Sequence, residues 1–95
     1  MEHIFSATDI LAQLISFDTT SSKSNKPMIE FISKFLNKHN IASNIGSNIE
    51  KSKGDLIATI GPMVEGGVVL SGHTDTVPVD GQQWDSDPFL LTKKN

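Results

Sequence analysis

The chain has 95 residues, of which 37% are hydrophobic and 20% charged, and it contains no cysteine. This length fits one small domain, and the lack of cysteine excludes a disulfide scaffold, a thiolate metal site and a cysteine nucleophile. The net charge of −3 argues against a nucleic-acid-binding protein, which usually carries a basic face. All eight basic residues are Lys, so the chain has no Arg to bind a substrate carboxylate through two parallel hydrogen bonds.

Two amphipathic helices are predicted on either side of a polar loop at residues 19–26. The first covers about residues 8–17, and Ser6 with Asp9 three positions later resembles a capping box at its start. The second covers about residues 27–40. Its apolar residues recur at the spacing of a core-facing stripe: Met28, Phe31, Ile32, Phe35 and Leu36.

After residue 40 the pattern changes from helical to strand-like. We expect a weak, exposed strand within 41–49, a strand at 55–60, a short buried strand at 68–70 and a further strand at 89–92. Two helices followed by strands predict an α/β fold with a mixed β-sheet.

The segment that follows the predicted strand at 68–70 contains a Gly-His-x-Asp pattern, Gly72 to Asp75. In an extended backbone, residues two apart point to the same side, so the His73 imidazole and the Asp75 carboxylate can meet. A histidine that binds a metal through one nitrogen often donates its other N–H to a carboxylate, which fixes the tautomer. The spacing alone leaves open an exposed His–Asp pair without this function.

The longer run SGHTDTVPVDGQQW..DPF, from Ser71 to Phe89, resembles the first metal-ligand motif of the dinuclear zinc aminoacylase and carboxypeptidase family. Residues 11–21 (LAQLISFDTTS) also look like the first helix and following loop of that family. Within the family, Pro78–Gln82 favours members that deacetylate an N-acetyl amino acid, with desuccinylase and dipeptidase members as alternatives. The resemblance covers about residues 8–91.

This resemblance implies that His73 is a ligand of one zinc or cobalt ion and that Asp75 is the catalytic aspartate that orients His73. It implies two metal ions, an N-acyl amino acid substrate and hydrolysis of its amide by water. We therefore expect residues 1–95 to be an incomplete N-terminal part of a zinc-peptidase-like catalytic domain, without a second domain. The other ligands, the general-base glutamate and the substrate carboxylate anchor are expected beyond residue 95, so we expect the 95 residues alone to be inactive.

Other residues are weaker site candidates. We expect His39 to lie at a helix end and His3 near the terminus, which explains both without a role as ligands. Turns explain the acidic residues near the motif, which are Asp80, Asp85 and Asp87. Packing explains the aromatic residues Trp84 and Phe89. An alternative hypothesis is that the chain is a non-catalytic product of a split or decayed gene and associates with a partner through exposed sheet edges. No apolar run approaches the roughly 20 residues of a membrane span, and we expect neither membrane nor nucleic-acid partners and a cytoplasmic location.

Overall fold

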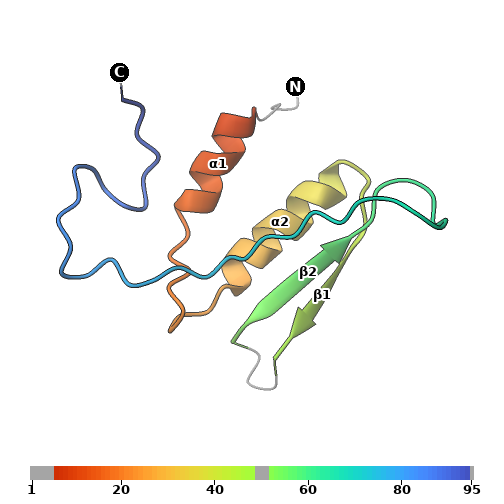
Figure 1. Cartoon of the computed structure of the whole chain (residues 1–95), viewed down its shortest axis with the longest axis horizontal. Helices are drawn as coiled ribbons and strands as arrows, with labels where there is room; N and C mark the ends of the chain where they lie inside the picture. The colour runs from red at the N-terminus through yellow and green to blue at the C-terminus, as the bar shows by residue number, and fades with distance from the viewer. Residues whose placement is uncertain (1–5, 49–51, 95) are drawn as a thin grey trace.

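The computed structural model describes residues 6–48 and 52–94. Helices α1 (Ala7–Ile15) and α2 (Lys26–Lys38) are followed by strands β1 (Ser43–Ser47) and β2 (Gly54–Ala58) (Figure 1). This order confirms the predicted α/β arrangement, and the four elements lie close to their predicted positions. Ile49, at the end of the first predicted strand, lies outside the described residues. Among the residues described, neither helix has the length and hydropathy needed to cross a membrane.

Local sequence determines where the helices begin and end. The Ser6 hydroxyl accepts a hydrogen bond from the Asp9 amide, and the Asp9 carboxylate accepts one from the Ser6 amide, both at 3.1 Å. This is the predicted capping box. Helix α2 ends where Asn40 adopts a φ of 60°, which lets the Ile41 amide donate to the Leu36 carbonyl at 3.0 Å. Such a left-handed residue is a common helix terminator, and here it leads the chain into β1.

The core lies between α2 and the hairpin of β1 and β2. The strands pair in antiparallel fashion, with Ser43 opposite Ala58, and α2 packs against both strands (Figure 1). Among the described residues, the buried apolar side chains are Met28 and Ile29, and Ile29 is only 4% exposed. A Cβ at Gly54 would lie 3.7 Å from Ile29 carbons, an ordinary packing distance, so Ile29 lies beside β2. The predicted stripe contained Met28 and missed Ile29.

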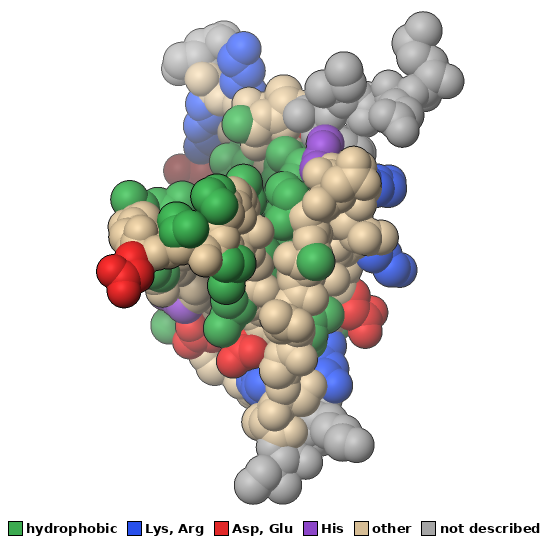
Figure 2. All heavy atoms as spheres, turned by 90° about the vertical axis from the view of Figure 1, so that its right-hand side faces the viewer, with side chains coloured by type: hydrophobic (Ala, Val, Ile, Leu, Met, Phe, Trp, Pro, Cys, Tyr) green, Lys and Arg blue, Asp and Glu red, His purple; other side chains and the backbone are tan. Residues whose placement is uncertain are grey.

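The predicted strands at 68–70 and 89–92 are wrong for this structure, because neither segment forms a strand. Val68, Val69 and Leu70 are 86%, 90% and 92% exposed, so they are not buried as predicted. An apolar strand is buried when neighbouring strands and a covering layer enclose it, whereas the sheet formed by the described residues has two strands. Apolar side chains are accordingly exposed on the surface (Figure 2). At 89–92, a turn that bonds the Leu90 amide to the Asp87 carbonyl replaces the strand.

Candidate active site

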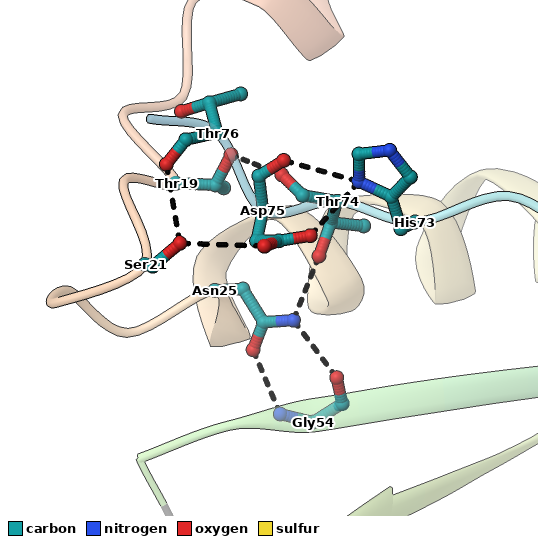
Figure 3. Close-up of polar contacts among 8 residues, drawn as sticks. All are labelled: Thr19, Ser21, Asn25, Gly54, His73, Thr74, Asp75 and Thr76. Atoms are coloured by element: carbon teal, nitrogen blue, oxygen red, sulfur yellow. Dashed lines mark hydrogen bonds and ion pairs between the residues drawn. The ribbon is translucent and has the colours of Figure 1, made fainter. Parts of the chain in front are cut away.

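The motif segment at 72–76 lies beside the loop that joins α1 to α2 (Figure 3). Thr20 and Thr76 form an isolated parallel bridge. In it, the Thr76 amide donates to the Thr19 carbonyl at 3.2 Å, and the Ser21 amide donates to the Thr76 carbonyl at 3.0 Å. The Thr19 hydroxyl also donates to the Thr74 carbonyl. The first polar loop of the sequence therefore holds the motif in place.

His73 and Asp75 meet, as the two-residue spacing predicts. The His73 Nδ1 atom lies 2.8 Å from Asp75 Oδ1 and 3.1 Å from the Asp75 backbone carbonyl oxygen. Both facing atoms accept hydrogen bonds when the carboxylate is ionised, so Nδ1 carries the proton. In the neutral ring, this tautomer leaves a lone pair on Nε2. The two side chains are 84% and 62% exposed, so the pair is open to solvent.

The carboxylate of Asp75 has a second neighbour on the opposite loop. Ser21 Oγ lies 3.3 Å from Asp75 Oδ2 and 3.3 Å from the Thr76 carbonyl oxygen (Figure 3). Because a hydroxyl has one proton, it donates to one of these two oxygens at a time. Asp75 therefore has one oxygen toward the imidazole of His73 and the other toward Ser21.

Asn25 joins the motif to the hairpin. Its Nδ2 donates to the Gly54 carbonyl and to the Thr74 hydroxyl, each at 2.9 Å, and its Oδ1 accepts from the Gly54 amide at 2.7 Å (Figure 3). Thr74 thus points to the buried Asn25, whereas His73 and Asp75 on either side of it are exposed. Sequence reasoning missed Asn25 and Ser21, because no local pattern marks contacts this far apart in the chain.

A second charged pair stabilises the loop before the motif. The Asp18 carboxylate accepts hydrogen bonds from the Lys23 ammonium and from the amide and hydroxyl of Thr20. The Lys23 ammonium, followed by the Thr20 donors, lowers the pKa of Asp18 from 3.8 to about 2. In turn, the Asp18 carboxylate raises the pKa of Lys23. These contacts close the loop that carries Thr19, Thr20 and Ser21.

Acid is expected to loosen this loop. Because the folded-state pKa of Asp18 lies below its unfolded value, its contacts contribute stability that is complete above about pH 4 and is lost as the pH falls through about 2. The effect is expected to be small, since water screens an exposed pair. Asp18→Asn should flatten the dependence of the unfolding free energy on pH across this window, while the control Glu30→Gln on the exposed face of α2 should not. An equal slope in all three proteins would contradict the assignment.

The His73–Asp75 pair has the chemistry of one metal ligand together with the carboxylate that orients it. Nε2 of His73 has the free lone pair that a metal requires, and the Asp75 carboxylate holds the other nitrogen. Within residues 6–48 and 52–94, no group of three or more His, Asp or Glu side chains is arranged to hold a metal ion. The residues described therefore include a candidate ligand with its orienting carboxylate, and not a complete ligand set.

The weaker candidates have local contacts elsewhere. The His39 ring packs edge-on against Phe35, with ring centroids 4.7 Å apart. Asp85 lies 3.9 Å from the Lys94 ammonium, and Asp87 accepts a hydrogen bond from the Phe89 amide at 2.9 Å. Trp84 Nε1 donates to the Val79 carbonyl within its own loop at 3.3 Å. Asp80 is exposed. His3 lies outside the described residues. These contacts fit the helix-end and turn explanations, whereas Trp84 is 50% exposed and is not a buried packing residue as predicted.

Comparison with known proteins gives matches over nearly the whole chain. An enzyme of Buchnera aphidicola subsp. Schizaphis graminum is 38% identical over 92 residues, and one of Pasteurella multocida is 36% identical over 96 residues; these alignments cover 90% and 97% of this chain. A third, from Proteus mirabilis, is 38% identical over 78 residues. The chain spans about a quarter of the length of the first two relatives and a fifth of the third. No protein-family model and no solved structure matches it.

The chain is therefore a homologue of deacetylase enzymes, which are hydrolases. All three of these relatives are acetylornithine deacetylases, and the chain is homologous to part of their sequence. The matches confirm the family resemblance that the motif between Ser71 and Phe89 suggested.

Proposed function

We propose that this chain provides the first metal ligand and its orienting carboxylate to a metal-dependent deacetylase that hydrolyses N2-acetyl-L-ornithine to L-ornithine and acetate. The observation that carries the proposal is the His73–Asp75 contact at 2.8 Å, in a chain that is 38% identical to an acetylornithine deacetylase over 92 residues. The chain would be the N-terminal part of the catalytic domain. The proposed setting is arginine biosynthesis in the cytoplasm.

Each residue of the pair has a distinct proposed role. His73 would bind zinc or cobalt through Nε2, and Asp75 would hold the Nδ1 proton, keep the ring in that tautomer and increase its basicity as a ligand. When bound, a divalent ion supplies the Lewis acidity for amide hydrolysis. A catalytic zinc site usually has three protein ligands, so we expect no hydrolysis by the 95 residues alone.

A chimera tests the proposal directly. Residues 6–94 replace the aligned segment of the Pasteurella multocida relative, which matches 97% of this chain. The purified chimera, with zinc or cobalt, is expected to release acetate from N2-acetyl-L-ornithine, whereas residues 1–95 alone should not exceed a protein-free control. A folded chimera without this activity would contradict the proposal. Preferential hydrolysis of an N-succinyl amino acid or a dipeptide would instead favour the desuccinylase or dipeptidase alternative.

The exposed apolar segment supports a second candidate function, self-association of a non-catalytic chain. Val68, Val69 and Leu70 are almost fully exposed, and the hairpin of β1 and β2 has no further strand on either side among the described residues. Unpaired strand edges readily pair with another chain.

Residues 1–95 are then expected to elute above monomer size in gel filtration. Val69→Lys should restore a monomer, since it places a charge in the exposed apolar segment and burying an unpaired charge against another chain is costly. The control Asn37→Lys, on the exposed surface of α2, should leave the oligomer unchanged. A monodisperse wild-type monomer with a sharp thermal transition would exclude this candidate.

A further inference from the structure

Asn25 occupies a helix-capping position without capping the helix. It is the N-cap residue of α2, where an Asn side chain normally accepts a hydrogen bond from an amide of the first turn. Here its side chain makes no such bond. The residue is buried, and its side chain instead makes three hydrogen bonds to Gly54 and Thr74. The Asn25 side chain therefore joins β2, at Gly54, to the motif segment, at Thr74.

The contacts require a carboxamide and fix its orientation. Gly54 presents an amide that needs an acceptor and a carbonyl that needs a donor, so Oδ1 faces the amide and Nδ2 faces the carbonyl. The second Nδ2 proton then reaches the Thr74 hydroxyl. A carboxylate has no proton to donate, so Asp at position 25 would lose the bond to the Gly54 carbonyl, but it could still accept a hydrogen bond from the Thr74 hydroxyl. Leu has no polar side-chain atom, so Leu at position 25 would lose all three bonds.

Thr74 is the residue through which Asn25 acts on the site. Its hydroxyl is held by Asn25, and its carbonyl accepts from the Thr19 hydroxyl. His73 and Asp75 flank it, point to the other side of the extended backbone and are mainly exposed. With little packing of their own, these two side chains take their relative direction from the backbone at Thr74.

We propose that Asn25 is a positioning residue that holds Thr74 so that Asp75 faces His73 Nδ1 and Nε2 stays free for a metal ion. The inference rests on the proposed function only in the use of Nε2. The effect of Asn25 on the tautomer of the His73 ring does not require a metal ion, so it can be measured on this chain alone.

The test measures the tautomer of the His73 ring by ¹⁵N NMR in residues 1–95, without metal, at about pH 9, where an ordinary imidazole is neutral. In the wild type, the Nδ1–H form is expected to dominate. Asn25→Leu, which removes every hydrogen bond to Thr74 and Gly54, should lower the ratio of the Nδ1–H to the Nε2–H form by about tenfold, the scale of one hydrogen bond to a charged group. The control Asn37→Leu makes the same change on the exposed surface of α2 and should leave the ratio unchanged.

Two variants of Thr74 cover the case in which Asn25→Leu does not fold. Thr74→Val removes the hydroxyl and leaves the bonds between Asn25 and Gly54 in place, so it should shift the tautomer ratio in the same direction. Thr74→Ser retains the hydroxyl and should restore the wild-type ratio. A wild-type ratio in folded Asn25→Leu, or in Thr74→Val, would overturn the proposal.

A separate measurement keeps this inference apart from the proposed function. The chimera is titrated with Co²⁺ and followed by its visible absorption, with His73→Ala as the comparison. If Co²⁺ binding does not depend on His73, the proposed metal role fails while the tautomer result still decides the role of Asn25. If binding does depend on His73, Asn25→Leu should weaken it by about 10–100-fold, as expected for a residue that supports a ligand.

Discussion

Replacing His73 by Ala in the chimera is expected to abolish hydrolysis of N2-acetyl-L-ornithine. The substitution removes the one metal ligand that this chain is proposed to provide, and the described residues contain no group of three or more His, Asp or Glu side chains that could hold a metal ion instead. Asp75→Asn retains the ligand and loses the acceptor charge that orients it, so its loss should be smaller, about 10–100-fold. The measurement is the rate of acetate release, with metal content determined on the same samples.

The control for this prediction is His39→Ala, which removes an exposed imidazole at the end of α2, where the ring packs on Phe35. It should leave the rate unchanged. Equal activity of His73→Ala and His39→Ala would show that His73 is not a ligand, and equal losses for His73→Ala and Asp75→Asn would indicate that Asp75 does more than orient the ring.

Ile29→Ala is expected to be the most destabilising single truncation in this chain. Ile29 is 4% exposed, and its carbons lie next to Gly54, where α2 packs against β2. Truncating a buried Ile to Ala typically costs about 2–5 kcal/mol, from lost transfer free energy and the cavity left behind. A small chain has little stability to lose, so the urea midpoint followed by circular dichroism should fall sharply.

Ile57→Ala provides the matched control, because Ile57 lies on β2 but is 69% exposed. The same truncation there should change the free energy of unfolding by no more than about 0.5 kcal/mol, as at most surface positions. Similar losses at both positions would mean that both faces of the hairpin are buried in solution. That result would favour self-association of the chain.

Local patterns predicted the features that depend on nearby residues. The capping box of Ser6 and Asp9, the order of the four elements and the meeting of His73 with Asp75 all follow from spacings of three residues or fewer, or from periodicity. The strand expected at 68–70 depended on neighbours rather than on its own apolar residues, and the described sheet has no third strand to bury it.

The residues that hold the site in place, Ser21 and Asn25, could not be predicted from such patterns. Ser21 and Asn25 lie in a polar stretch whose composition predicts only a loop. Their contacts reach Asp75 and Thr74, 54 and 49 positions further along the chain. Nothing in a single sequence distinguishes the Asn that bridges two segments from the serines around it, so these roles required the three-dimensional structure.

The bridge from Asn25 to Gly54 and Thr74 has a consequence for the order in which the chain folds. Helix α2 and the hairpin are neighbours in sequence, so closing the loops between them costs little chain entropy. The contacts that hold the motif close loops of 49 to 55 residues, and they are polar, so they gain little from burial until their partners are in place. The helix–hairpin unit should therefore form early and serve as the template on which the histidine–aspartate pair is aligned late.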